Sequence, residues 1–305
     1  MRKVPPFFLA AATTVLVFLI ALLSASAQWR PVKTGILFGI SGIALVENSL
    51  DEMGCPPGTC FVIVHDNKIE SDGRIAILTV RGQDSLDYLP LQWPDGEEWP
   101  IDLEAIALVP GTHDSAFMAV TSFGRVYYFT LDSTGTIQLR QIFSLPDLPE
   151  NTNLEGFDLH LINGQLLAVW GHRGSPDDSG VLYWGWFDWN GYQISGQGSA
   201  VITVPWPEED VRHISDIKVN NAGILYITSS RDPGDDGPFD SAVYAAGLFS
   251  MNGNAIEFRP ASSLAPLYRI NGHKIEALEF LPGLSGGKIF GTDDENQGSS
   301  IYINR

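Results

Sequence analysis

The chain has 305 residues, enough for one large domain or two small ones. Its hydrophobic fraction of 44%, with 8 Trp, 9 Tyr and 16 Phe, excludes a disordered chain, and its 31 Gly and 19 Pro indicate many turns. Acidic residues outnumber basic ones 36 to 18, and the resulting net charge of −18 excludes nucleic acid as the main partner, because a phosphate backbone would be repelled.

Residues 1–27 have the features of an export signal. Arg2 and Lys3 are followed by an apolar run from Phe7 to Leu23, and Ala25-Ser26-Ala27 provides a cleavage site of small residues. An uncleaved membrane anchor is the alternative, because the apolar run is near the short limit for spanning a bilayer. The cleavage site favours removal, which predicts one exported domain over residues 28–305, periplasmic or extracellular, with no membrane attachment.

The two cysteines lie close together in the sequence. Cys55 and Cys60 enclose Pro-Pro-Gly-Thr, a turn-forming segment, and export would place them in an oxidising compartment. We therefore predict a local disulfide. Metal binding is the weaker alternative, because a closed zinc site needs four ligands.

A short block recurs five times along the rest of the chain. Its pattern is an apolar residue, then Ser or Glu, then a small residue or Asp, then a second apolar residue. The copies begin at positions 40, 103, 154, 214 and 275, with a period of 51 to 63 residues: Ile40–Ile43, Leu103–Ile106, Leu154–Phe157, Ile214–Ile217 and Ile275–Leu278. Five copies at nearly one period indicate a repeat architecture, and a β-sandwich would not explain them.

Each block opens a series of short β segments separated by turns. The second repeat predicts strands over Leu103–Val109, Ala116–Thr121, Val126–Leu131 and Ile137–Phe143. The third predicts Leu154–Leu161, Leu166–Trp170, Val181–Trp189 and Tyr192–Val204, with Asn-Gly hairpin turns. Four antiparallel strands per repeat is the pattern of a propeller blade.

The last repeat has room for only three strands before the chain ends: Ile275–Leu281, Lys288–Thr292 and Ser300–Ile303. A spare strand at Ile36–Phe38, before the first block, can complete that blade and hide two sheet edges. We therefore predict an all-β, five-bladed propeller with four antiparallel strands per blade, closed by an N-terminal strand that completes the last blade.

The second residues of the five blocks are expected to converge in the central channel, and we call them the ring: Ser41, Glu104, Glu155, Ser215 and Glu276. Three carboxylates facing one another repel and raise their pKa values unless something compensates. A hard cation with oxygen ligands would do so, and Ca²⁺ suits carboxylates and hydroxyls. Protonated or water-bridged carboxyls and catalytic carboxylates are the two alternatives.

The order Ser, Glu, Glu, Ser, Glu over five blades resembles the central calcium ring of the calcium-activated nucleotidase (apyrase) propellers. The Leu-Glu-Gly and Ile-Glu-Ala blocks also look like those of secreted bacterial propellers of the esterase-like phytase type. The resemblance implies that calcium would bind the five ring residues.

The ends of the second strands are expected beside the ring, on one face of the propeller. Candidate binding residues there are His65, His172, Arg173, Arg231 and Asp232, and candidate catalytic bases are Asp66, Asp293 and Asp294. Two arginines at one mouth can hold a small phosphorylated or acidic molecule. Both arginines can equally form ion pairs with neighbouring aspartates.

These expectations lead to three hypotheses. The first is an exported calcium-containing hydrolase of phosphate esters or anhydrides. The second is a propeller that binds a ligand or protein without chemistry, since fold does not imply function. The third is a glycosidase that uses Glu104, Glu155 and Glu276, with carboxyl groups about 5–9.5 Å apart.

Overall fold

The computed structural model describes residues 29–304, except 49, 57, 83–84, 113–114, 254 and 284–286. The predicted signal segment 1–27 lies outside these residues. Within the described part, no helix is long and apolar enough to cross a membrane. The helical elements there are short 3-10 turns: η1 (Ile36–Phe38), η2 (Asp51–Met53) and η3 (Glu295–Gln297).

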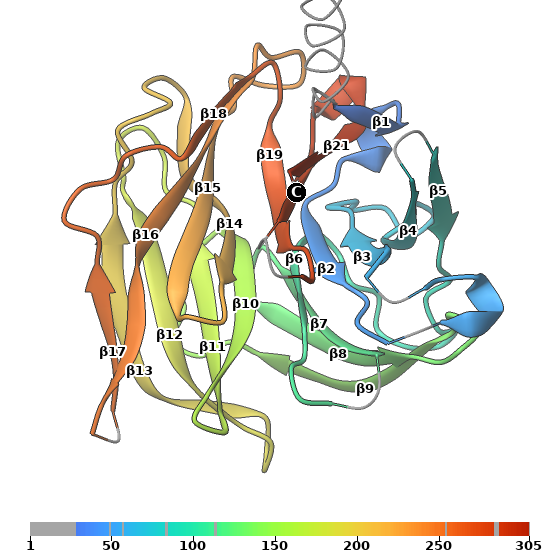
Figure 1. The fold of residues 1–305 in the computed structure, drawn as a ribbon, viewed down its shortest axis with the longest axis horizontal. Helices are drawn as coiled ribbons and strands as arrows, with labels where there is room; N and C mark the ends of the chain where they lie inside the picture. The colour runs from blue at the N-terminus through green and yellow to red at the C-terminus, as the bar shows by residue number, and fades with distance from the viewer. Residues whose placement is uncertain are drawn as a thin grey trace, which may run out of the picture.

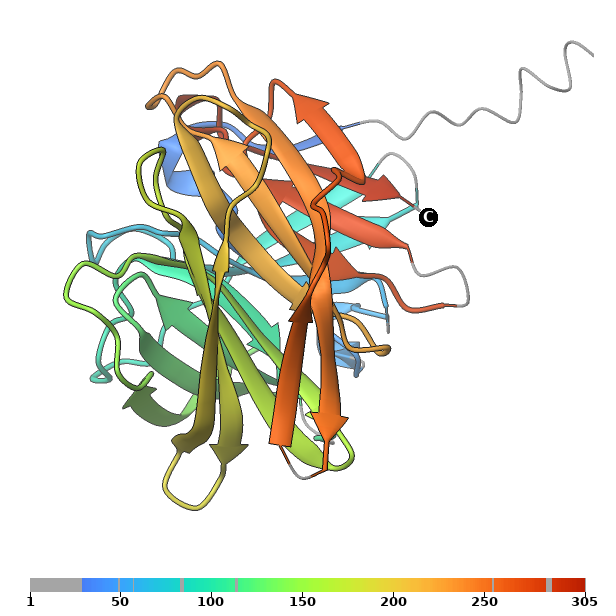
Figure 2. The ribbon, with the colours of Figure 1, turned by 90° about the vertical axis from the view of Figure 1, so that its left-hand side faces the viewer.

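The described residues form five antiparallel sheets, and these are the blades of the predicted propeller (Figures 1 and 2). Blade 1 contains β2 (Gly42–Leu45), β3 (Cys60–Val64), β4 (Ile75–Arg81) and β5 (Ser85–Pro90). Blade 2 contains β6 (Leu103–Leu108), β7 (Ser115–Thr121), β8 (Arg125–Leu131) and β9 (Ile137–Ser144). Blade 3 contains β10 (Leu154–Ile162), β11 (Gln165–His172), β12 (Gly180–Asp188) and β13 (Gln193–Ile202).

Blade 4 contains β14 (Val211–Val219), β15 (Ile224–Arg231), β16 (Asp240–Asn252) and β17 (Ala255–Pro260), and a short extra strand, β18 (Tyr268–Asn271), pairs with one end of β16. Blade 5 contains β19 (Ile275–Phe280), β20 (Lys288–Thr292), β21 (Ser299–Asn304) and β1 (Arg30–Lys33). The strands predicted for the second and third repeats match the observed ones to within a few residues at each end.

The ring closes as predicted, but through a different segment. The strand that completes blade 5 is β1, which pairs with β21, whereas Ile36–Phe38 forms the 3-10 turn η1. Ile36 and Leu37 are more than 40% exposed, and Gly35 before them has a positive φ of 100°. Segment 30–33 alternates half-buried with exposed residues, as an outer edge strand does, and therefore has no apolar run that would mark it as a strand in the sequence.

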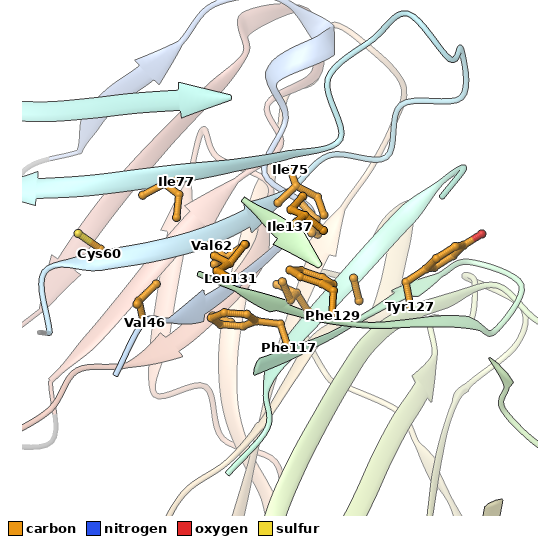
Figure 3. Packing of buried hydrophobic residues seen from close by; sticks show 14 of the residues in the cluster. Val46, Cys60, Val62, Ile75, Ile77, Phe117, Tyr127, Phe129, Leu131 and Ile137 are labelled. Atoms are coloured by element: carbon orange, nitrogen blue, oxygen red, sulfur yellow. The ribbon is translucent and has the colours of Figure 1, made fainter. Parts of the chain in front are cut away.

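Large apolar side chains fill the space between neighbouring blades. Figure 3 shows one such cluster, in which Val62 and Ile77 of blade 1 pack against Phe117 and Phe129 of blade 2. Burying these groups drives the association of the sheets. The innermost strands β2, β6, β10, β14 and β19 contact one another in a closed circle around the channel, at the centre of Figure 1.

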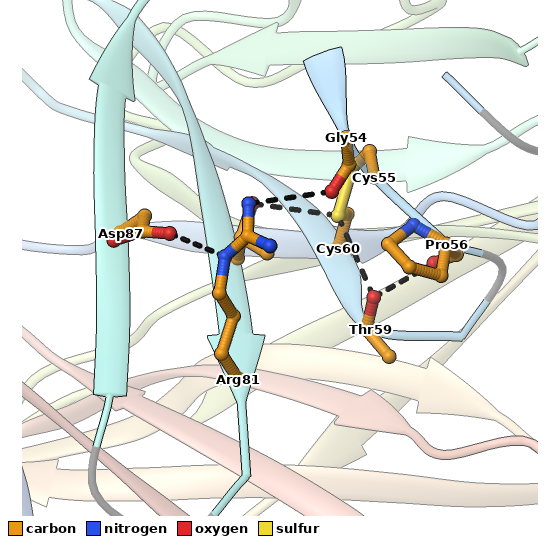
Figure 4. The surroundings of a disulfide bond; sticks show 8 residues. Gly54, Cys55, Pro56, Thr59, Cys60, Arg81 and Asp87 are labelled. Atoms are coloured by element: carbon orange, nitrogen blue, oxygen red, sulfur yellow. Dashed lines mark hydrogen bonds and ion pairs between the residues drawn. A yellow bond between two sulfur atoms is a disulfide. The ribbon is translucent and has the colours of Figure 1, made fainter. Parts of the chain in front are cut away.

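Cys55 and Cys60 form the predicted disulfide, between η2 and β3 (Figure 4). Arg81 lies beside the loop, where its Nη2 donates to the carbonyl of Gly54 at 3.3 Å and its Nε to Asp87 at 2.5 Å. Both cysteines are buried in the apolar cluster between blades 1 and 2, so the bridge ties the loop after η2 to the start of β3. A disulfide is also compatible with export.

Candidate functional site

The mouth of the channel is the face at which the five inner strands begin. In blades 2, 3, 4 and 5 the pairing of the first two strands shifts register at the start of the inner strand. Glu104, Glu155 and Glu276 are the residues at three of these irregularities. Because a β-bulge redirects the side chain at which it occurs, the bulges allow the ring carboxylates to face the channel.

Two ring carboxylates are buried in ion pairs. Glu155, 1% exposed, accepts from Nη1 of Arg173 at 3.1 Å and from Nη1 of Arg212 at 3.0 Å. The same Nη1 of Arg212 donates to Glu276 at 3.0 Å, and Nζ of Lys274 lies 3.2 Å from that carboxylate. Arg212 thus bridges blades 3, 4 and 5 across the mouth.

Arg212 and Lys274 provide the charge compensation that the sequence analysis assigned to calcium. Although burial alone lowers it, the carboxylates of Glu155 and Glu276 hold the pKa of Arg212 above its usual value. Burial is also the main reason that the pKa of Glu276 is well raised, against the opposing effect of Lys274. With a guanidinium between two of the ring carboxylates, the ring differs from an all-oxygen cage, and calcium binding by the ring stays a prediction.

The two serines of the ring are buried. The hydroxyls of Ser215 and Ser230 are 2.7 Å apart, and Ser41 is 1% exposed. Glu104 is different, because it is partly exposed and has no arginine or lysine within ion-pair distance among the described residues.

Glu104 lies beside two aspartates, and the three residues form what we call the carboxyl triad: Asp66, Asp102 and Glu104. One carboxylate oxygen from each lies within 4.8 Å of the others, and all three residues are partly exposed. Asp102 is held in place by Ser122, whose hydroxyl donates to it, and by Lys68 at 3.2 Å. The triad is therefore an accessible acidic cluster at the mouth, between blades 1 and 2.

Two members of the triad, Asp66 and Glu104, have raised pKa values. Burial raises the pKa of Asp66 to about 6, and the charges of Asp293, Glu295 and Asp102 add to this rise while Lys274 opposes it. The pKa of Glu104 is well above its usual value because of burial and the nearby Glu155, Glu276 and Asp66. Carboxyl groups with such pKa values can exchange protons near neutral pH.

The remaining predicted residues lie at the same mouth but are engaged in other contacts. His65 is buried, with Nδ1 2.5 Å from the carbonyl of Gly39 and Nε2 3.1 Å from the hydroxyl of Tyr88. Burial lowers the pKa of His65. Nδ1 of His172 lies 3.0 Å from the backbone nitrogen and oxygen of Asn153.

The other predicted site residues, Arg231, Asp232, Asp293 and Asp294, are in ion pairs. Arg231 pairs with Glu209 at 3.0 Å and with Asp210 at 3.5 Å, and Asp232 pairs with Arg212. Asp293 lies 3.3 Å from Nζ of Lys274. Asp294 accepts from the backbone nitrogen of Lys274 at 2.8 Å and lies 2.7 Å from Nδ1 of His273. Of the three predicted bases, Asp66 is therefore the one that is partly exposed and without an ion pair in the described residues.

Sequence reasoning missed Asp102, Arg212 and Lys274. Asp102 and Lys274 stand two positions before the ring residues Glu104 and Glu276, just before β6 and β19 begin. A charged residue two positions before a ring glutamate was the signal that could have found both. Arg212 lies three residues before Ser215, across an irregular register, and carried no such signal.

The far end of the channel is crossed by a buried lysine. Nζ of Lys218, on β14, donates to the carbonyl of Ile106 at 3.1 Å and lies 3.4 Å from Glu279 and 3.6 Å from Asp158. Glu279 in turn accepts from the backbone nitrogen of Leu45 at 3.3 Å. These contacts of Lys218 and Glu279 join all five blades.

Comparison with known proteins gave structural matches alone. No protein-family model and no curated protein matches the chain. An endo-arabinase from Bacteroides thetaiotaomicron matches with a TM-score of 0.50 and 11% identity, over 90% of this chain and 97% of that one. An endo-1,4-beta-xylanase from the same organism matches with a TM-score of 0.51 and 12% identity, over 89% and 92%. At this identity the similarity establishes the fold.

These matches correct the sequence-based resemblance. The apyrase and phytase propellers suggested by the ring are not supported, because the matched structures are glycoside hydrolases. The phosphohydrolase hypothesis is wrong for the same reason. It also loses its structural basis, since Arg173 and Arg231, the proposed phosphate ligands, are paired with carboxylates. The ring pattern misled because Ser and Glu at five equivalent positions specify polar channel residues, whatever ligand the propeller binds.

Proposed function

We propose that the protein is a glycoside hydrolase that cleaves glycosidic bonds at the mouth of the channel, with Asp66 and Glu104 as its carboxyl pair. The observation that carries this proposal is the carboxyl triad, which is accessible and has two members with raised pKa values. The fold similarity to an endo-arabinase and a xylanase supports it.

Glycosidases need one protonated and one ionised carboxyl group on either side of the scissile bond. Glu104 has the strongly raised pKa, which suits it to donate a proton to the glycosidic oxygen. Asp66, with a pKa of about 6, is ionised at neutral pH and can act on the anomeric carbon. Burial, and the charges of neighbouring carboxylates, of which Asp102 is one, favour the protonated form of Glu104.

The short separation between the carboxyl oxygens favours one stereochemical course. Retaining pairs lie about 5–5.5 Å apart, whereas inverting pairs lie about 6.5–9.5 Å apart to admit a water molecule. With oxygens of Asp66 and Glu104 within 4.8 Å, the geometry supports retention, in which Asp66 forms a glycosyl ester and Glu104 then activates the hydrolytic water.

Glu155 and Glu276 have a different role in this proposal. Each is held by cations and almost fully buried, so neither is free to approach a sugar in the way the third hypothesis required. We assign them to anchoring Arg212, Arg173 and Lys274 around the mouth.

The test is release of reducing sugar from linear arabinan and from xylan by residues 28–305. We expect hydrolysis by the wild type, and a loss of kcat of at least about a hundredfold in Asp66→Asn and in Glu104→Gln. Glu257→Gln, which changes an exposed carboxylate on β17, is the matched control and should keep full activity. Activity that survives in both mouth variants, or no activity on any glycan, would overturn the proposal. In the second case binding without hydrolysis would favour the non-catalytic hypothesis.

A further inference from the structure

A cavity of about 240 Å³ lies beside the carboxyl triad in blade 1. Its walls come from the β3–β4 loop, which also carries Asp66, and from the segment after β5, which leads to Asp102. Lining residues include Ser71, Asp72, Arg74, Gln92, Trp93 and Trp99. Trp99 precedes Asp102 by three residues, so their Cα atoms are at most about 11 Å apart. The cavity is thus adjacent to the proposed catalytic residues.

The notable residue of this cavity is Arg74, which is 3% exposed. Its Nη1 donates to the carbonyl of Asp72 at 2.5 Å and its Nη2 to the carbonyl of Ile69 at 2.6 Å. Its Nε has no hydrogen-bond partner, and no carboxylate of the described residues lies within ion-pair distance of it. Burial lowers the pKa of Arg74, and the charges of Asp72 and Glu70 oppose this effect without forming an ion pair with it.

A buried guanidinium without a carboxylate is unusual, because buried charges are normally paired. The two carbonyl contacts use only some of the five N–H donors of the Arg74 guanidinium. A carboxylate is the group whose geometry best matches the remaining donors. The guanidinium also lies 5.4 Å from the centre of the Trp99 ring, so an apolar face is available next to the charge.

We propose that this cavity binds the carboxylate of an acidic sugar unit, a uronate, and that the substrate is therefore an acidic glycan. Arg74 binds the carboxylate, the ring of Trp99 contacts the sugar, and Ser71 and Gln92, which also line the cavity, offer polar side chains to its hydroxyl groups. Glu70 and Asp72 also line the cavity. Glu70 is exposed and Asp72 is partly exposed, whereas Arg74 is buried. Water and salt therefore screen the repulsion between these two carboxylates and a bound uronate more than they screen its attraction to Arg74. The substrate assignment rests on the proposed glycosidase function, but the binding site does not.

The test is calorimetric titration of residues 28–305, carrying Glu104→Gln to prevent turnover, with glucuronate, glucose and acetate. We expect glucuronate to bind at least tenfold more tightly than either glucose, which lacks the carboxylate, or acetate, which lacks the sugar. Arg74→Gln should remove this preference and leave glucuronate within about threefold of glucose. Arg125→Gln, which changes a partly exposed arginine paired with Glu98, is the control and should keep the preference.

Trp99→Leu provides a second variant in case Arg74→Gln does not fold, and it should weaken glucuronate more than acetate. Equal affinity for glucuronate and glucose would overturn the proposal, and equal affinity for glucuronate and acetate would overturn its sugar component. The two proposals fail separately. Uronate binding without hydrolysis of any glycan would contradict the glycosidase function and leave the uronate site standing. Hydrolysis of neutral arabinan without a preference for uronate would contradict the uronate site and leave the glycosidase function standing.

Discussion

Arg212 is the residue on which the charge balance of the mouth depends. It contacts Glu155, Glu276 and Asp232, two of which are almost fully buried. A buried ion pair adds little net stability when intact, but removing one partner leaves an uncompensated charge and costs about 3–5 kcal/mol.

We therefore expect Arg212→Met to lower the free energy of unfolding by about 3 kcal/mol at pH 7. Urea denaturation measures this. Arg231→Met is the matched control, because Arg231 pairs with two exposed carboxylates and should cost less than about 1 kcal/mol. Adding Glu155→Gln to Arg212→Met should restore part of the lost unfolding free energy, because it removes the carboxylate that Arg212 no longer compensates. Equal effects of the two arginine variants would contradict this account.

The strand β1 is the element that closes the molecule. It comes from the N-terminal end of the described chain, yet it supplies the outermost strand of the last blade. Trp29 next to it packs against His273 and Tyr302, with ring centroids 4.1 and 5.3 Å away. Without β1, the outer edge of β21 would be an unpaired row of backbone donors and acceptors.

Removing residues 28–34 should therefore lower the thermal midpoint and promote aggregation through the exposed edge of β21. Differential scanning calorimetry and light scattering follow the two effects. A synthetic peptide of residues 28–35, added to the shortened protein, should suppress aggregation, whereas a peptide of the same composition in scrambled order should not. A shortened protein that stays monomeric and equally stable would show that closure does not depend on β1.

At the scale of the whole molecule, the stability should depend on pH in an uncommon direction. Burial raises the pKa of several carboxyl groups: Asp66, Glu104, Asp158, Asp216, Glu276 and Glu279. Between their unfolded values near pH 4 and their folded values, the native state binds more protons than the unfolded state, so stability falls as pH rises. The net charge of −18 adds to this, because deprotonation increases self-repulsion.

We expect the thermal midpoint to be several degrees higher at pH 5 than at pH 7.5. Asp66→Asn should reduce the fall of the thermal midpoint between about pH 4 and pH 6, which is the range between the unfolded and folded pKa values of Asp66. Glu257→Gln, at an exposed position, should leave the profile unchanged. A midpoint that rises from pH 5 to pH 7.5 would show that the buried carboxyls do not dominate.

The repeated block and the turns between strands were sufficient to predict the blade number, most strand positions, the disulfide and the closure of the ring. These features depend on local patterns: apolar alternation, Gly, Asn and Asp at turns, and a period that recurs five times. The ring residues could also be placed at the channel, because equivalent positions in repeats occupy equivalent places.

The chemistry of the site was decided by the tertiary structure. Whether Glu155 is a metal ligand, a catalytic group or a partner of arginine depends on where Arg212 of another blade lies, and no local pattern encodes that distance. The same is true of the triad, in which Asp66 of blade 1 meets Asp102 and Glu104 at blade 2, and of Arg74, whose lack of a carboxylate partner appears only once the chain is folded. Local sequence patterns specify strands and turns, whereas ion pairing and pKa values arise from contacts between residues that are distant in the sequence.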